Sequence, residues 1–178
     1  MLEGLDKINW SQLHHAYGDA SDVPSLIRQL LSKDNDIVDK AIYELFGNIW
    51  HQGTVYEASA IAVPFLQEVL KFSGINDKTK NSLVCLLASM ADGYDTKDGR
   101  YADATRIAVE QEIQLLFPYL YCEVPVVRES VAGALSHYPQ YIAETLPMLE
   151  KALASESDEE AKEKITEAIE TLKSEKTQ

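Results

Sequence analysis

Cysteine is scarce in this sequence, and so are long apolar runs. Only Cys85 and Cys122 are present, outside any CxxC pair and within apolar, helical stretches. Such cysteines are typical of buried free thiols rather than of disulfides or metal ligands, which favours a reducing cytoplasm. The longest apolar run, residues 83–91, falls far short of the ~20 residues that span a bilayer. The first residues also lack the basic and apolar regions of a signal peptide, so we expect a cytoplasmic protein with no membrane partner.

Basic residues are few as well. Asp and Glu number 29 against 16 Lys and Arg, which gives a formal net charge of −13 and an isoelectric point near 4.6. Proteins that bind nucleic acid normally carry a basic face, and this sequence has no cluster of Lys and Arg. We therefore expect no nucleic-acid partner. An acidic surface either serves solubility alone or speeds association with a basic partner, and the charge leaves both explanations open.

Recognisable catalytic motifs are missing. The sequence has no GxSxG, no phosphate-binding P-loop and no Rossmann glycine pattern. His14, His15 and His51 lack the spacing of an HExxH zinc helix, and hydrogen bonding between the first two helix pairs is the preferred interpretation of them. The polar loop 92–100 does not match a calcium loop, because Lys97 stands where an EF-hand needs glycine. We expect no catalytic residues, no metal and no cofactor.

Helical periodicity is what the sequence does contain, and strand-like alternation is almost absent. Four of the six prolines open or continue an apolar stretch in the same context, apolar-Pro-x-Leu; they are Pro24, Pro64, Pro118 and Pro147. A polar break and a second amphipathic segment follow each of them. Pro64 and Pro118 lie deep in apolar segments and are expected to kink their helices. The pattern predicts an all-α fold of paired helices.

Helix, turn and helix repeated about four times is typical of a solenoid, because one pair alone cannot bury its apolar face. The predicted pairs are 22–50, 55–91, 101–138 and 141–173, in a single domain of residues 1–178. Residues 1–20 are expected to cap the first pair, with a short helix over 8–15. The predicted apolar stripes of the second helices consist of Ile37, Ala41, Leu45 and Ile49; Leu83, Leu86, Leu87 and Met90; Val127, Val131, Ala134, Leu135 and Tyr138; and Ala161, Ile165, Ala168, Ile169 and Leu172.

The third pair carries a family resemblance. Its Pro118-x-Leu120, acidic turn and Val127-Arg128-x-x-Val131-Ala132-x-Ala134-Leu135 resemble the HEAT-repeat family. The segments 14–18 and 51–59 also look like those of small bacterial HEAT-like proteins. The resemblance implies a right-handed α-solenoid that works by binding another protein.

Two irregular segments stand out from the repeat. In the first, Gly53 is expected to end a helix and Thr54 to cap the next one, with Glu57 completing a capping box. The same segment concentrates rings and hydrogen-bond donors of the kind found at binding hot spots, so scaffold and binding roles both stay open. The second is the loop 92–100, which we expect to contact a partner because long polar loops are often functional.

The predicted function is a protein–protein interaction module, most specifically an immunity or antitoxin-like protein that grips a basic toxin. We expect a monomer. The alternatives are a HEAT-like enzyme, of chromophore lyase or DNA glycosylase type, and an assembly scaffold subunit. The residues predicted to bind the partner are Asp39, Tyr43, Glu44, Trp50, His51, Gln52, Tyr56, Asp92, Tyr94, Asp95, Arg100 and Arg128.

Overall fold

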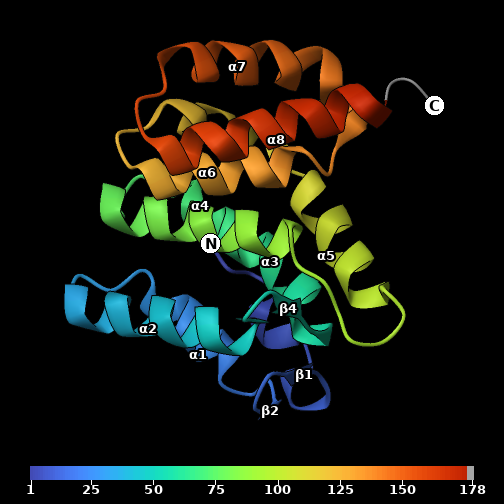
Figure 1. Cartoon of the computed structure of the whole chain (residues 1–178). Coiled ribbons are helices and arrows are strands. Elements are labelled where there is room, and N and C mark those ends of the chain that lie inside the picture. The colour runs from blue at the N-terminus through green and yellow to red at the C-terminus, as the bar shows by residue number, and fades with distance from the viewer. Residues whose placement is uncertain (176–178) are drawn as a thin grey trace. The chain divides into compact units, whose positions relative to one another are not determined.

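The structure is a computed structural model that describes residues 1–175, and it is mostly helical (Figure 1). The prediction of a helical fold class is confirmed. The described residues form eight α-helices: α1 (Val23–Gln29), α2 (Asn35–Asn48), α3 (Glu57–Leu70), α4 (Asp77–Ala91), α5 (Arg100–Glu110), α6 (Pro125–Leu135), α7 (Ile142–Ser155) and α8 (Glu159–Glu175). Contacts group the chain into two compact units, unit 1 (residues 1–112) and unit 2 (residues 113–178), which are described separately.

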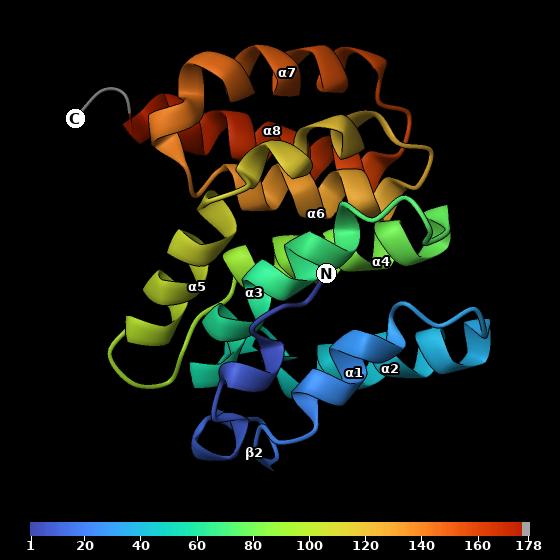
Figure 2. The same ribbon diagram turned by 180° about the vertical axis from the view of Figure 1, so that it is seen from behind.

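Unit 1 holds α1 to α5 and two short antiparallel hairpins. The hairpins are β1 (His14–His15) with β2 (Gly18–Asp19), and β3 (Trp50–His51) with β4 (Thr54–Val55). Helix α3 packs against both α4 and α5, and α1 packs against α2. Figures 1 and 2 show both hairpins and the loop before α5 gathered on one side of this unit.

The helices of unit 1 begin at polar caps and bury apolar stripes. Asn76 accepts the backbone N–H of Thr79 at the start of α4, and Asp34 accepts that of Asp36 at the start of α2. The predicted stripe of α4 is buried as expected. In α2 the predicted positions Ala41, Leu45 and Ile49 are buried, but Ile37 remains 41% exposed and Val38 faces the core in its place.

The prediction of a short helix at the N-terminus is wrong. Residues 8–15 do not form a capping helix; they form the 3-10 turn Trp10–Gln12 and then strand β1. A segment of eight residues forms too few helical hydrogen bonds to stand alone, and pairing with β2 satisfies its backbone instead. Hairpins were not expected from the sequence, because strands of two residues show no alternation.

Unit 2 holds α6, α7 and α8, with the 3-10 helices Ile113–Leu115, Phe117–Tyr121 and Pro139–Tyr141. Helix α8 packs against α6 and α7, and its predicted apolar stripe and that of α6 are both buried. The sequence predicted that Pro118 kinks an α-helix, but Pro118 is the second residue of a 3-10 helix, since proline lacks the N–H and disfavours α geometry in the preceding residue. Cys85 of unit 1 and Cys122 of unit 2 are half-buried and belong to no disulfide.

Within the described residues, no helix combines the length and the hydropathy needed to cross a membrane.

Candidate functional site

The β3–β4 hairpin turns at Gln52 and Gly53, which both have positive φ, 51° and 90°. Positive φ at both central residues characterises the type I′ turn, whose twist matches that of paired strands. Trp50 pairs with Val55 and His51 pairs with Thr54. The prediction that Gly53 ends a helix and that Thr54 caps the next is therefore wrong, since both residues belong to the hairpin.

The start of α3 is tied to the same hairpin. The backbone N–H of Tyr56 donates to Ser59 Oγ at 2.7 Å, and Ser59 Oγ donates to the carbonyl of Ile49 at 2.6 Å. Ser59 is fully buried, so these bonds form away from water. Ser59 thus takes the capping role that the sequence analysis assigned to Thr54 and Glu57.

The loop 92–100 joins the hairpin through its backbone. The N–H of Tyr94 donates to the carbonyl of Gly53 at 3.0 Å, and the N–H of Val55 donates to the carbonyl of Tyr94 at 2.8 Å. The ring of Tyr94 covers Gly53 so closely that a Cβ there would lie 2.8 Å from its Cε1 atom. The two irregular segments noted in the sequence therefore form one surface. We call residues 50–56 and 92–101 with Tyr17 the hairpin–loop surface.

Asp95 holds the loop in shape. Its carboxylate accepts the backbone N–H groups of Lys97, Gly99, Tyr101 and Ala102 at 2.8–3.1 Å. These bonds, led by the one from Ala102, lower the pKa of Asp95 to about 2. Asp95 was predicted to contact a partner, but its oxygens are already occupied, so its role is structural.

Tyrosines and a histidine converge on the outer face of the hairpin. Tyr17 Oη lies 3.3 Å from His51 Nδ1, and the two rings meet edge to face at 5.3 Å. Burial raises the pKa of the Tyr56 phenol, and the phenols of Tyr17 and Tyr94 raise it further. Tyr17 is 69% exposed and Tyr94 is 55% exposed. The cluster thus combines ring surface and hydroxyl groups at the solvent boundary.

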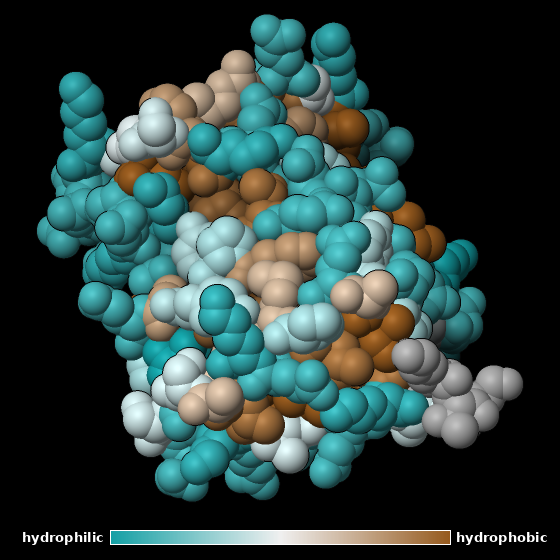
Figure 3. All heavy atoms as spheres, turned by 90° about the horizontal axis from the view of Figure 1, so that it is seen from above, coloured by the Kyte–Doolittle hydropathy of each residue, from teal (hydrophilic) through white to brown (hydrophobic). Residues whose placement is uncertain are grey.

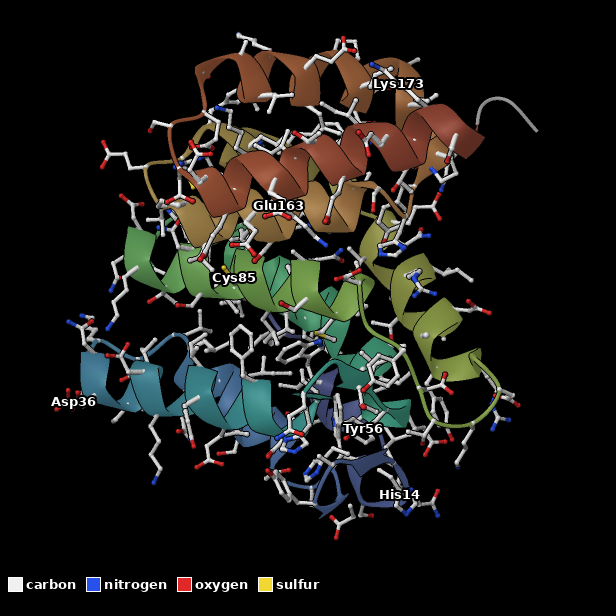
Figure 4. The ribbon with its side chains drawn as sticks, viewed as in Figure 1. His14, Asp36, Tyr56, Cys85, Glu163 and Lys173 are labelled. Atoms are coloured by element: carbon white, nitrogen blue, oxygen red, sulfur yellow. The ribbon has the colours of Figure 1, made fainter. Side chains whose placement is uncertain are left out.

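A pocket of about 210 Å³ opens beside this cluster. His14 and Glu57 pair across its edge, with Nδ1 and Oε2 at 3.4 Å, and Figure 4 shows His14 and Tyr56 close to one another. Lys97 lies over the ring of Tyr101, with Nζ 5.4 Å from the centroid. The lining residues all belong to unit 1: His14, Thr54, Val55, Tyr56, Glu57, Asp95, Thr96, Lys97 and Tyr101.

Three other residues of the predicted binding set are held by contacts within the chain or lie at a helix end. Arg100 is exposed, stacks 5.2 Å from the Tyr101 centroid and lies 3.9 Å from a carboxylate oxygen of Asp98. Asp92 is the exposed C-cap of α4. Trp50 contacts Phe46 edge to face, and its Nε1 is buried with no acceptor among the described residues.

The face of α2 holds the next three predicted residues. Tyr43 is 76% exposed and Glu44 is half-buried. Asp39 pairs with Lys78 of α4. Tyr17 reaches the same helix, because its Cε2 lies 3.8 Å from the Cβ position of Gly47. Tyr43 therefore stands one helical turn from Gly47, beside which the ring of Tyr17 lies.

Arg128 does not belong with these residues. It lies in unit 2, where its guanidinium forms two hydrogen bonds of 2.6 Å with Glu156 and a third with the carbonyl of Cys122. Only 13% of its side chain is exposed, and 2% of that of Glu156. The guanidinium ties the start of α6 to the turn before α8, and the contact of Arg128 with a partner stays a prediction.

Tyr17 and Tyr101 belong to the site although no motif indicates them, and Lys97 was predicted only as part of the loop 92–100. Tyr17 follows a histidine pair, and Tyr101 directly follows the loop. Two further contacts involve His15: its Nε2 lies 2.9 Å from Oδ1 of Asp22, and the backbone N–H of Tyr17 donates to its Nδ1. Asp22 also accepts a hydrogen bond from Asn48. In residues 1–175 no three His, Cys, Asp or Glu side chains are grouped so as to hold a metal ion.

Comparison with known proteins indicates the fold only. No protein-family model matches the sequence, and no curated protein matches it. Among solved structures, the chain is similar to an engineered protein whose crystal structure was a target of the Northeast Structural Genomics Consortium, with a TM-score of 0.59 and 21% identity. The match covers 87% of this chain and 64% of the engineered one, so the chain spans less than two thirds of that protein. At this identity the likeness concerns the backbone arrangement alone.

Proposed function

We propose that this protein is a binding module that holds a basic partner protein on its hairpin–loop surface, and that it neutralises a toxin in this way. The observation that carries the proposal is the cluster of the exposed Tyr17 and Tyr94 with the half-buried His51 on a rigid support. Tyrosine offers large contact area and a hydroxyl at low entropic cost, which makes it frequent in hot spots and paratopes.

Rigidity of the surface supports a binding role. Four backbone N–H groups hold Asp95, and the carbonyl of Gly53 and the N–H of Val55 hold the backbone of Tyr94. A preorganised loop loses little conformational entropy when a partner docks on it.

The charge of unit 1 supports a basic partner. Its residues include 17 Asp and Glu against 10 Lys and Arg, a net charge of −7. Complementary charge speeds the encounter of two proteins and disfavours partners of the same sign. The proposal includes the architecture expected from the sequence, a right-handed stack of HEAT-like helix pairs in a monomeric, cytoplasmic protein.

The test is capture of the partner from the native lysate, followed by calorimetry with the purified partner. Tyr17→Ala combined with His51→Ala removes the centre of the cluster and is expected to weaken binding at least about tenfold, the effect of truncating a hot spot. Ile107→Ala is the matched control, because Ile107 is 59% exposed on α5 outside the surface. It should leave the affinity unchanged.

The toxin-neutralising role adds a cellular readout. Co-expression of the wild-type protein should relieve growth arrest caused by the captured partner, and the double variant should not. Equal affinity of the double variant and the wild type would exclude this surface, and a harmless partner would exclude the toxin.

A further inference from the structure

The pocket beside Glu57 has the size of one amino-acid side chain. Its volume of about 210 Å³ lies below the ~300 Å³ at which pockets for small-molecule ligands begin. It adjoins the hairpin–loop surface, since Tyr56 and Tyr101 contribute to both. A partner docked on that surface would therefore place a side chain at the mouth of the pocket.

The walls suit a long side chain with an apolar stem. Val55 and the rings of Tyr56 and Tyr101 supply apolar contact area, and hydroxyl groups of Thr54 and Tyr56 supply hydrogen-bond acceptors. Flat aromatic faces also attract cations, and a planar guanidinium stacks on them best. Arginine combines the stem and the planar cation in one side chain.

Two carboxylates line the pocket, but only one has acceptor capacity to spare. Both oxygens of Asp95 accept two backbone N–H groups each. Glu57 makes one long contact, 3.4 Å to the exposed His14, and is itself 39% exposed. As the first residue of α3, Glu57 is held in place by the helix that begins there.

Lys97 is the positively charged lining residue that opposes a cationic guest, and Arg100, which does not line the pocket, lies over the same Tyr101 ring. Its ammonium sits on a flexible stem in the exposed loop, over the ring of Tyr101. Such a side chain can turn into solvent when a guest arrives, whereas Glu57 stays in the wall. An anionic guest would face Glu57 and Asp95 within a unit whose net charge is −7.

We infer that this pocket receives an arginine side chain of the partner, with the guanidinium paired to Glu57 and stacked on the tyrosine rings. The inference rests on the proposed function and adds the chemistry by which the partner is anchored. It assigns opposite effects to two residues of the wall: Glu57 strengthens binding of the guest and Lys97 weakens it.

The probe is N-acetyl-arginine amide, titrated into the full-length protein while the backbone amide resonances are followed by NMR. We expect shifts confined to His14 and to residues 54–57 and 95–101, which line the pocket or adjoin its lining. The neutral isostere N-acetyl-citrulline amide should bind about fivefold more weakly or not at all, because it cannot pair with the carboxylate. N-acetyl-leucine amide and N-acetyl-glutamate amide test an apolar and an anionic guest, and the lysine amide tests the need for a planar cation.

Two variants test the opposite effects assigned to Glu57 and Lys97. Glu57→Gln should weaken the arginine probe about two- to fivefold, as expected for a partly exposed ion pair, and Lys97→Ala should tighten it. The controls Glu112→Gln and Lys40→Ala change the same charges outside the pocket and should leave binding unchanged. Stronger binding of the leucine, glutamate or lysine probe than of arginine, or weaker arginine binding in Lys97→Ala, would overturn the inference.

The two proposals fail in distinguishable ways. Suppose that the captured partner loses affinity for the Tyr17→Ala/His51→Ala protein but the arginine probe does not bind in the pocket. Only the inference that the pocket receives an arginine side chain is then refuted. If the probe binds as described but no partner depends on the hairpin–loop surface, the proposed function fails.

Discussion

Among single residues, Asp95 has the largest influence on the candidate site, because one carboxylate holds four backbone N–H groups of the loop. Its pKa is lowered to about 2 from a usual value of 3.8. A lowered pKa means that the ionised group stabilises the folded loop above pH 4, and that this contribution is lost as the pH falls from about 4 to about 2.

Replacing Asp95 tests this role. Asp95→Asn keeps one acceptor oxygen but removes the charge and the second oxygen. We expect faster hydrogen exchange at the amides of Lys97, Gly99, Tyr101 and Ala102, and a smaller loss of stability between pH 4 and pH 2 than in the wild type. Asp98→Asn is the control, because Asp98 accepts a single N–H of the same loop. Equal exchange rates in the two variants would contradict the anchoring role.

The pair of Arg128 and Glu156 plays the corresponding role in unit 2. Arg128 lowers the pKa of Glu156 to about 2, chiefly through its hydrogen bonds. Because both side chains are almost fully covered, removing one leaves the other charge poorly solvated. Glu156→Ala should lower the free energy of unfolding by about 2 kcal/mol, measured by urea denaturation. The exposed pair of Glu150 and Lys173 supplies the comparison, where Glu150→Ala should cost less than about 1 kcal/mol.

At the scale of elements, the β3–β4 hairpin depends on its two turn residues. Gly53→Ala places a Cβ at positive φ and 2.8 Å from the ring of Tyr94. We expect a loss of about 1–2 kcal/mol in unfolding free energy and a change in the Tyr94 ring environment, read by NMR. Gln52→Asn should instead stabilise the protein slightly, since asparagine tolerates the left-handed conformation of a type I′ turn. Destabilisation by both substitutions would argue against this turn geometry.

The helices were predictable because their periodicity extends over many residues. The stripes of α4, α6 and α8 repeat over three or four turns, so a single misplaced residue does not hide them. In α2 one position was misplaced, with Val38 rather than Ile37 in the core, while the rest of the predicted stripe is buried. Strands of two residues leave no such pattern, and Gly53 has the same appearance in sequence whether it ends a helix or turns a hairpin.

The candidate site was predictable only where its residues are neighbours in sequence. Rings clustered at 50–56 indicated a binding surface, and so did the polar loop 92–100. Tyr17 reaches the site from a distant segment, which no local pattern reveals. The pairing of Arg128 could not be predicted for the same reason, because the buried carboxylate of Glu156 lies 28 residues away.

At the scale of the whole molecule, negative charge is spread over both units. Unit 2 carries 12 Asp and Glu against 6 Lys and Arg, close to the balance of unit 1. Figure 3 shows the side of α7 and α8, where apolar residues are visible between hydrophilic ones. Helix α8 alone exposes Glu159, Glu160, Glu163, Glu167 and Glu170. A field from so many charges acts on an approaching partner before contact, whereas the tyrosine cluster acts only after contact.

The charge of the protein and its tyrosine cluster should affect different rates of the captured partner, the first its association and the second its dissociation. Raising the salt concentration from about 0.05 M to about 0.5 M screens the field, so the association rate should fall about tenfold or more while dissociation changes little. Tyr17→Ala should do the reverse, because contacts made after docking govern the lifetime of a complex. Stopped-flow mixing measures both rates. An association rate that does not change with salt concentration would show that the acidic surface serves solubility alone. A Tyr17→Ala complex with the lifetime of the wild type would place the contact elsewhere on the chain.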